Sequence, residues 1–313
     1  MKLKSLFRRL NSAMTGGTRL SRRLRRRSCQ GTTIQPLESR TLLASVMDSG
    51  NGTLSIDLSA GERLKVVSNG TGYSFVSTTQ TFTDNGVDDP DDFTGFDTDT
   101  LGLIGLAQYT SVSITDSGAG ASVQLLDSGV NAYVHDFEIT LDDGAFGQSI
   151  VFDGGAHFGN HSLTANSDRS IQLFTGTNLT TVDGDIILKG VNTGDATGAL
   201  RGVALVAASI TTSGTGDILF NGIATGAGPA SDRRIGISLQ GASIISSTGT
   251  ATSAGRISLN GVGGACIDFN FGVVLGDATA VSSVMGDILI TGRGGDGTGI
   301  QNYGVRLANG VTI

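Results

Sequence analysis

The feature that most constrains the fold is a repeat in the second half of the chain. A motif of alternating aliphatic residues between two glycines occurs four times, at 184–190, 216–222, 255–261 and 286–292. After a Gly-rich stretch, each copy is followed by a second short motif, at 202–205, 236–239, 272–275 and 304–307. A third apolar position comes eight or nine residues after the glycine of the second motif, at Ile210, Ile244, Val281 and Ile313. The copies start 32, 39 and 31 residues apart, which is typical of a repeat architecture.

The apolar residues of both motifs lie two positions apart, which is the spacing of a β-strand with one buried face. A single repeat cannot bury that face, so neighbouring repeats must supply the core. We predict that this core contains Ile186, Leu188, Val203, Leu205, Ile218, Phe220, Ile237, Leu239, Ile257, Leu259, Val273, Leu275, Ile288, Ile290, Val305 and Leu307. Each fully buried branched side chain contributes about 1.5–3 kcal/mol, so such a core needs neither bridges nor metals.

These features predict an all-β fold, a parallel β-solenoid (β-helix) with coils of roughly 30–40 residues stacked about 4.8 Å apart. The glycines that bound each motif are expected at corners, where a chain needs positive φ or close backbone approach. We expect a disordered basic leader with a sorting-like motif at 1–44 and regular repeats at 182–313. The β-rich region at 45–181 between them has irregular spacing and is expected to form either degenerate coils or an N-terminal cap.

The chain ends at Ile313, on the third apolar position of a repeat and without a polar capping repeat. An open end exposes strand edges, which favours self-association. We therefore expect the sequence to be truncated, a fragment of a longer protein, with capping by another chain as the alternative.

The first 40 residues differ in charge from the rest. They carry 11 Lys or Arg and one acid, whereas the remainder carries 10 Lys or Arg and 27 Asp or Glu. The arginine-rich run at 21–28 could bind nucleic acid, anionic lipid or a targeting receptor, but a cleaved or disordered leader is the simpler interpretation. No apolar stretch of signal-peptide or membrane-helix length follows it. Because the body is acidic and only 5% of residues are aromatic, nucleic-acid binding is not expected.

The repeated order Gly-Asp-Ile-x-Ile-x-Gly, Gly-rich loop, Gly-Val-x-Leu and Ile resembles the repeats of filamentous-haemagglutinin-type bacterial adhesins and other β-helical surface proteins. The resemblance covers about the last 130 residues. It implies a cell-surface or extracellular protein that acts in adhesion or envelope structure.

A second resemblance follows the basic leader. The segment 35–44 is similar to a Leu-Glu-Pro-Arg-x-Leu-Leu motif near the N-terminus of large surface and secreted proteins of planctomycete-type bacteria, with Ser39 in place of the proline. The matching residues are Leu37, Glu38, Arg40, Leu42 and Leu43. The resemblance implies export or sorting, and a linker with chance leucines is the alternative.

Seven acids fall among the 16 residues from Asp84 to Asp99. Clustered carboxylates can hold Ca²⁺, and the candidate ligands are Asp84, Asp88, Asp89, Asp91 and Asp92. The Asp-x-Asp-x-Asp-Gly order of a calcium loop is absent, so a solvated acidic loop is favoured. We predict no other cofactor.

The remaining reactive residues give no catalytic pattern. His157 and His161 would share a face on a helix but not in Gly-rich β sequence, so loop histidines are predicted instead of a zinc site. The two cysteines are too few for a disulfide framework. Asp185, Asp217 and Asp287 recur at matching places in three repeats, whereas catalytic sets are normally unique, so we predict aspartates that cap turns.

Loops of variable sequence leave each repeat at the same point, at 191–201, 223–235, 262–271 and 293–303. In repeat proteins, variable loops gathered on one face often form the binding face. Four arginines near the second motif could bind anionic glycans or be solvated: Arg201, Arg233, Arg234 and Arg306. We predict a non-enzymatic surface protein whose partner is a glycan or another cell-surface component. The alternative is a carbohydrate-active β-helix enzyme, a polysaccharide lyase or hydrolase, with carboxylates and Lys or Arg converging on one face.

Overall fold

The computed structural model describes residues 44–48, 50–68, 72–77, 82–84, 93–94, 100–103, 106–117, 120–126, 133–142, 149–194, 199–225 and 233–313. The chain divides into two compact units, Met1–Arg40 and Thr41–Ile313, and all described residues belong to the second. Their regular structure is β-strand, apart from one short 3-10 helix, η2 (Leu106–Gln108), so the fold class is all-β. The basic leader and the sorting-like residues Leu37, Glu38, Arg40, Leu42 and Leu43 lie outside the described residues.

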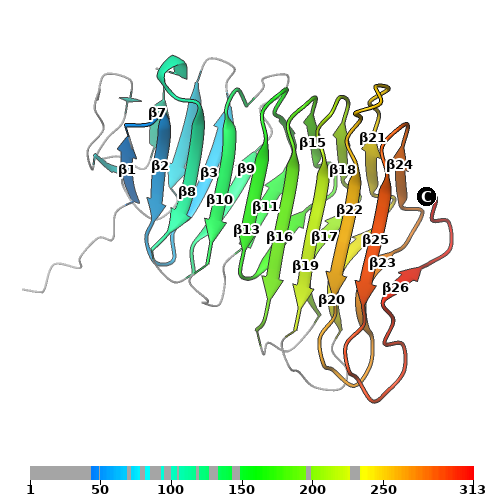
Figure 1. The fold of residues 1–313 in the computed structure, drawn as a ribbon. Helices are drawn as coiled ribbons and strands as arrows, with labels where there is room; N and C mark the ends of the chain where they lie inside the picture. Colours follow the sequence, from blue (N-terminus) through cyan, green and yellow to red (C-terminus); the bar gives the residue numbers. More distant parts are fainter. Residues whose placement is uncertain are drawn as a thin grey trace, which may run out of the picture. The chain divides into compact units, whose positions relative to one another are not determined.

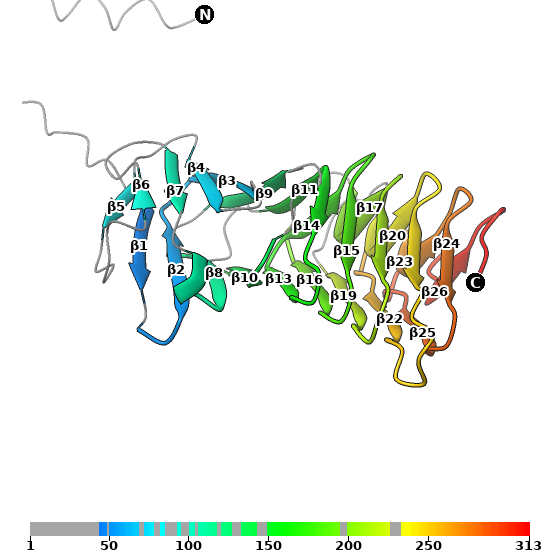
Figure 2. The same ribbon diagram turned by 90° about the horizontal axis from the view of Figure 1, so that it is seen from above.

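The strands form three sheets, which we call A, B and C (Figures 1 and 2). Sheet A has the spatial order β25 (Ile288–Arg293), β22 (Ile257–Val262), β19 (Ile218–Ala224), β16 (Ile186–Asn192), β13 (Leu163–Ser167), β10 (Asp136–Leu141), β8 (Ser111–Asp116), β2 (Thr53–Leu58), β1 (Ala44–Asp48) and β5 (Phe82–Asp84). Sheet B has the order β26 (Val305–Leu307), β23 (Asn270–Leu275), β20 (Arg234–Gln240), β17 (Leu200–Val206), β14 (Ser170–Leu173), β11 (Ser149–Asp153), β9 (Ser122–Leu126), β3 (Arg63–Ser68), β4 (Tyr73–Ser77), β7 (Thr100–Leu103) and β6 (Phe93–Thr94). Sheet C has the order β12 (Gly155–His157), β15 (Asn178–Thr181), β18 (Ser209–Thr212), β21 (Ile244–Ser247) and β24 (Ala280–Ser283).

From β13 to β24 the chain adds one strand to each sheet in turn, and we call each set of three strands a pass. The strands β16, β17 and β18 form one pass, and β19, β20 and β21 form the next. Strands of successive passes pair in parallel and in register, so that Ile186 pairs with Ile218 and Ile218 with Ile257. One sequence repeat therefore corresponds to one pass. In the first three repeats the three apolar segments become strands of sheets A, B and C, and in the fourth the last segment makes a single bridge, between Thr312 and Ala280.

The irregular region 45–181 contributes to the same sheets. Its strands β8 and β10 lie in sheet A and β9 and β11 in sheet B, each parallel to its neighbours in the later passes. Sheet C begins only with β12. Among the described residues before β12, successive passes add strands to sheets A and B only, so both sheets are continuous through the region of irregular sequence spacing.

Antiparallel strands cover the first parallel strands of sheets A and B. The strand β1 pairs antiparallel with β2 in sheet A, and β4 pairs antiparallel with β3 in sheet B. The antiparallel pairing continues from β4 through β7 to β6, while β5 pairs in parallel with β1. Strands in these positions occupy backbone N–H and C=O groups that an open edge would expose, which limits edge-to-edge association.

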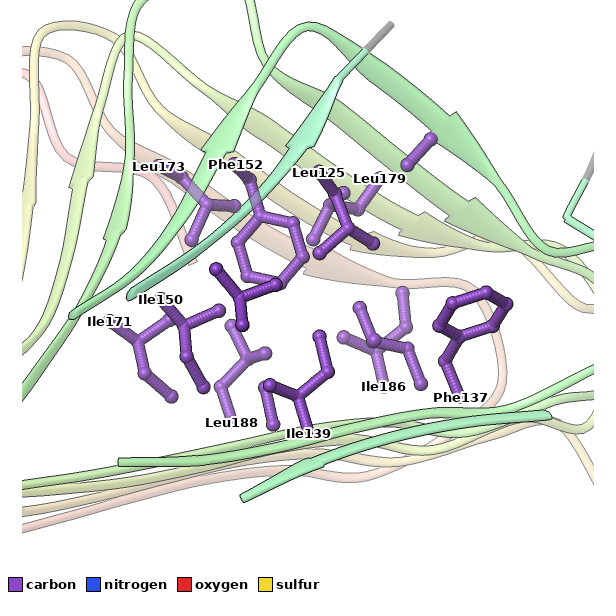
Figure 3. Close-up of a cluster of buried hydrophobic side chains, with 14 of the residues drawn as sticks. Leu125, Phe137, Ile139, Ile150, Phe152, Ile171, Leu173, Leu179, Ile186 and Leu188 are labelled. Carbon is purple, nitrogen blue, oxygen red and sulfur yellow. The ribbon is translucent and has the colours of Figure 1, made fainter. Parts of the chain in front are cut away.

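One continuous apolar core extends from Ala44 to Val281. Figure 3 shows part of it, where Ile139 and Leu188 on sheet A lie opposite Ile150 and Phe152 on sheet B. Of the predicted core residues, all those from Ile186 to Leu275 are buried. The apolar faces of the sheets are therefore buried against one another.

The last pass differs from the rest. Ile288 and Ile290 of β25 are only partly buried, and Val305 and Leu307 of β26 are 40% and 54% exposed. Within the described residues, β25 and β26 are the last strands of sheets A and B and have a neighbour on one side only. The prediction that all four side chains are buried in the core is therefore too broad, because burial here requires a pass on both sides.

The third apolar position needs a correction in one repeat. Ile245, and not Ile244, pairs with Ile210 and with Val281 in sheet C. Ile245 is fully buried, whereas Ile244 is 45% exposed. Successive strand residues face opposite sides of a sheet, so an assignment that is wrong by one residue places the outward side chain in the core.

Glycines allow the backbones of different strands to approach closely. A Cβ atom on Gly190 of β16 would overlap the carbonyl oxygen of Gly202 in β17. In the next pass, a Cβ atom on Gly222 of β19 would overlap the carbonyl oxygen of Gly236 in β20. A Cβ atom on Gly216 would likewise overlap the backbone of Gly184 in the preceding pass. None of these glycines has a positive φ. Close backbone approach, and not a left-handed corner, therefore requires glycine at these positions.

Substitutions on the two faces of sheet A test which side chains the core contains. Ile257 is fully buried and pairs with Ile218 and Ile288, whereas Ser258 next to it lies on the opposite face. We expect Ile257→Asp to abolish cooperative thermal unfolding because it buries a carboxylate without a partner, and Ser258→Asp to melt like the wild type. Melting followed by circular dichroism measures both, and similar behaviour of the two variants would contradict the assignment.

Two alanine substitutions test the role of the glycines. Gly222→Ala should lower the free energy of unfolding by about 1–3 kcal/mol, because its Cβ would overlap the backbone of Gly236. Gly276 is a matched control, since its φ is not positive and the nearest atom to an added Cβ lies 3.9 Å away. Urea denaturation should show little change for Gly276→Ala. Equal losses in both variants would mean that close approach is not what glycine provides at 222.

Candidate functional site

The outward side chains of sheet B line up in two columns across its strands. In β3, β9, β11 and β14 the register aligns one column of Lys65, Gln124, Val151 and Gln172, and a second column of Arg63, Ser122, Ser149 and Ser170. The residues between the two columns are buried in the core, so the columns face away from it. We call these eight residues the sheet B face. In the views of Figures 1 and 2 its strands follow one another along the sheet.

A hollow of about 480 Å³ lies over β3, β9 and β11. Its outward lining comes from the sheet B face: Arg63, Lys65, Ser122, Gln124, Ser149 and Val151. The Gln124 Nε2 group donates a hydrogen bond to Asp153 Oδ2 at 3.1 Å, which orients that amide at the rim. Hydroxyl, amide and cationic groups thus dominate this hollow, and they suit a polar, oxygen-rich ligand.

A second, smaller hollow lies further along the same face, and we call it the Arg201 hollow. It has a volume of about 110 Å³ and is lined by Ser170, Gln172, Asn192, Ala199, Arg201 and Ala204. Gln172 Nε2 donates to Ser170 Oγ at 2.9 Å, and Asn192 Nδ2 donates to the carbonyl oxygen of Arg201 at 3.3 Å. The Nε atom of Arg201 is buried and has no hydrogen-bond acceptor among the described residues.

The Arg201 hollow is electropositive. Burial lowers the pKa of Arg201, and the positive charge of Arg233 lowers it further. A guanidinium remains protonated at physiological pH in spite of such a shift, so the result is a concentrated positive charge. Among the described sheet B strands from β3 to β26, the outward side carries one carboxylate, Asp153. It carries four cationic side chains: Arg63, Lys65, Arg201 and Arg306.

Aromatic side chains lie on the outer side of sheet B beyond the Arg201 hollow. Ile235, Phe271 and Val274 form a small buried cluster separate from the core, with Phe269 packed against it. The Arg233 guanidinium lies 5.4 Å from the Phe269 ring centre, and that of Arg306 lies 5.3 Å from the Phe271 ring centre. Cation–π contacts of this kind hold arginine side chains in place while their N–H groups remain able to donate.

The variable loops all connect sheet A to sheet B, as their common position in each repeat predicts. The A strands before them end at Asn192, Ala224, Val262 and Arg293. In the two loops that are fully described, 263–269 and 294–304, the segments bond to each other: Gly299 N–H donates to the Ile267 carbonyl at 2.9 Å, and Asn270 Nδ2 donates to Asn302 Oδ1 at 2.8 Å. These loops are therefore ordered by the same pass-to-pass pairing as the strands.

The four arginines of the sequence prediction do not share one environment. Arg201, Arg233 and Arg306 lie on the outer side of sheet B as described above, whereas Arg234 is fully buried. The Nη1 group of Arg234 donates to the carbonyl oxygen of Arg233 at 3.3 Å. Arg234 therefore belongs to the interior of the loop region and not to the accessible surface.

The repeated aspartates bind backbone groups of the next pass. Asp185 Oδ1 accepts the N–H of Asp217 at 2.7 Å, and Asp217 Oδ1 accepts the N–H of Arg256 at 2.8 Å. Asp217 also forms an ion pair with Arg256, with a distance of 3.0 Å between Oδ2 and Nε. These carboxylates join successive passes just before the sheet A strands β16, β19 and β22 begin. Asp287, at the matching place in the last pass, is exposed.

The histidines have structural partners. His157 Nδ1 lies 2.6 Å from Thr180 Oγ1, and His161 Nδ1 lies 3.7 Å from Asp136 Oδ1. His135 is buried with its Nδ1 atom 2.7 Å from the hydroxyl of Tyr73, whose pKa burial raises above its usual value. The sequence did not indicate this buried pair, because its members lie far apart in the chain.

Within the described residues no three His, Cys, Asp or Glu side chains are grouped so that they could hold a metal ion. Asp88, Asp89, Asp91 and Asp92 lie outside those residues, and for Asp84 only the backbone of β5 is described. Cys266 is a buried thiol.

Comparisons with protein-family models, with curated proteins and with solved structures find no match to this chain. The described residues contain no helix that is long and apolar enough to cross a membrane.

Proposed function

We propose that this protein is a non-enzymatic β-solenoid that acts at the cell surface or after secretion, in adhesion or envelope structure. In this proposal the sheet B face and the loops next to it bind an extended glycan or another cell-surface component. The observation that carries the proposal is the alignment of outward side chains in two columns across β3, β9, β11 and β14, in which every member except Val151 is polar or charged.

The topology supports the solenoid part of the proposal. The passes add strands to three parallel sheets and keep their register from one pass to the next. In a solenoid each coil advances by one interstrand spacing, about 4.8 Å. Over β3, β9, β11 and β14 the outward columns then present polar groups at this interval along one direction, interrupted by Val151, which suits a linear polymer better than a compact ligand.

The surface location rests on sequence resemblance. The repeats resemble those of bacterial surface adhesins, and residues 37–43 resemble a motif of exported planctomycete-type proteins. The loops between sheets A and B vary in length and sequence while the strands around them are constant, which is how repeat proteins diversify a binding face.

A second candidate function is a carbohydrate-active enzyme, and one observation favours it. A hollow of about 360 Å³ outside sheet A is lined by Asp142, Asp168 and Lys189, together with Thr140 and Asn166. Carboxylates and an amine in one hollow are groups that acid–base cleavage of a polysaccharide uses. Asp142 and Lys189 are exposed, however, and lack the burial that tunes catalytic groups. The binding function is therefore preferred.

Protease treatment of intact cells that produce the protein tests its location. An antibody against residues 233–313 should lose its signal on western blots, because the protein is accessible from outside. A cytoplasmic protein blotted from the same sample must survive as the control. A protected signal would overturn the surface part of the proposal.

Filling the larger hollow tests the binding face. Ser149→Tyr places a bulky side chain in this hollow, whereas Ser258→Tyr places the same side chain on the outside of sheet A. We expect the full chain to be retained on immobilised envelope polysaccharide, with at least tenfold weaker retention for Ser149→Tyr and unchanged retention for Ser258→Tyr.

The same samples distinguish the enzyme. Release of reducing ends or unsaturated sugars by the wild type, abolished by Asp168→Asn, would overturn the non-enzymatic proposal. Equal retention of both tyrosine variants would show that binding occurs elsewhere.

A further inference from the structure

We infer that the Arg201 hollow is a subsite for an anionic substituent, a carboxylate or a sulfate group, on the saccharide that the sheet B face binds. This inference rests on the proposed function and names its ligand class. It concerns one position of the face, where a single acidic group of the polymer would enter the hollow while the sugar residues lie along the columns.

The size of the hollow fits one substituent. Its volume of about 110 Å³ lies well below the roughly 300 Å³ at which pockets begin to enclose whole drug-sized ligands. The larger hollow over β3, β9 and β11, at about 480 Å³, belongs to the same face. A polymer that follows the face would therefore place a ring or rings over the larger hollow and a charged group in the smaller one.

The lining supplies donors. Arg201 lines the hollow, and its buried Nε–H has no acceptor among the described residues, so an anion there would lie beside a guanidinium whose charge is not neutralised by those residues. The amide of Gln172 and the hydroxyl of Ser170 line the same hollow and are linked by a hydrogen bond of 2.9 Å. A guanidinium binds carboxylate and sulfate-like oxyanions through charge-assisted hydrogen bonds, which are stronger than those between neutral groups.

The charges around the hollow are uncompensated within the described part of the chain. Arg201 and Arg233 repel each other, and Arg306 adds positive charge on the same side of sheet B, three strands away on β26. An anion beside Arg201 offsets the repulsion from Arg233 and stabilises the charged form that burial disfavours. A neutral saccharide offers neither effect.

A second cationic position strengthens the assignment to a polyanion. Arg63 and Lys65 on β3 lie four strands from Arg201 on β17 along the order β3, β9, β11, β14, β17. At one interstrand spacing per step this separation is about 19 Å. A polymer with acidic groups at several residues can reach both positions, whereas a single small anion can occupy only one.

Binding of labelled oligosaccharides to the full chain tests the inference. Fluorescence anisotropy with oligogalacturonate, dextran sulfate and neutral dextran separates carboxylate, sulfate and uncharged ligands. We expect tight binding of at least one acidic probe and at least tenfold weaker binding of dextran. Arg201→Gln should weaken binding of that probe by about tenfold, which corresponds to the loss of one charge-assisted contact.

Arg256→Gln is the matched control. It removes the same charge from the start of a sheet A strand, where Arg256 pairs with Asp217, and it should leave the affinity unchanged. The arginines of the leader are common to all variants, so a loss of affinity that is seen in Arg201→Gln and not in Arg256→Gln cannot come from them. Gln172→Leu, which removes an amide from the hollow without changing charge, provides a second test if Arg201→Gln does not fold.

The outcomes separate this inference from the proposed function. Equal losses in Arg201→Gln and Arg256→Gln, or an unchanged affinity in both Arg201→Gln and Gln172→Leu, would overturn the inference, because binding would then be general attraction. Retention on envelope polysaccharide with no preference for either acidic probe would overturn the inference and leave the proposed function standing. Preference for oligogalacturonate would identify the substituent as a carboxylate, and preference for dextran sulfate would identify it as a sulfate.

Discussion

The structure depends on close backbone contact between sheets A and B, and glycine makes this contact possible. Where Gly190 meets Gly202, and where Gly222 meets Gly236, a Cβ atom would overlap a backbone carbonyl of the other strand. The contact recurs in the two following passes, where Gly261 meets Gly272 and Gly292 meets Gly304. The aliphatic residues near these glycines are buried in the core between the sheets in each pass that has a neighbour on both sides. A larger residue at one pass would separate the sheets there and weaken the packing of the passes on either side.

The residues that stabilise the fold are different from those available for binding. The inward positions must be apolar in every pass, and the corner aspartates must accept backbone N–H groups of the next pass, as Asp185 and Asp217 do. Neither set is available for recognition. The outward positions of sheet B and the loops carry no such requirement, so lysine, arginine, glutamine and serine can accumulate there. The candidate site lies on the outward side of the sheet B strands, whose inward side chains pack in the core.

The sequence alone predicts the repeat, the strand spacing and most of the inward residues, because these depend on local alternation. It also predicts that the repeated aspartates are structural. It leaves the reason for the glycines open between two causes, since a sequence does not show which backbones meet. It places Ile244 instead of Ile245 in the core, because two adjacent isoleucines satisfy the same pattern. The sheet B face cannot be found from the sequence, since Lys65, Gln124 and Gln172 become neighbours only through the register of strands with irregular spacing.

Charge at long and short range acts in opposite directions on this molecule. Residues 41–313 carry 27 acids against 10 Lys or Arg, so a polyanion approaching from a distance meets repulsion. At physiological ionic strength, charges more than about 8 Å apart are largely screened. A polymer seated on sheet B therefore responds mainly to the groups beside it, and among the described residues those are predominantly Arg63, Lys65, Arg201 and Arg306. In the proposed complex, the acidic body would disfavour indiscriminate attachment to polyanions, while the cationic side chains of sheet B would attract a polyanion that aligns with that sheet. Selectivity then comes from the position of the charges and not from their sum.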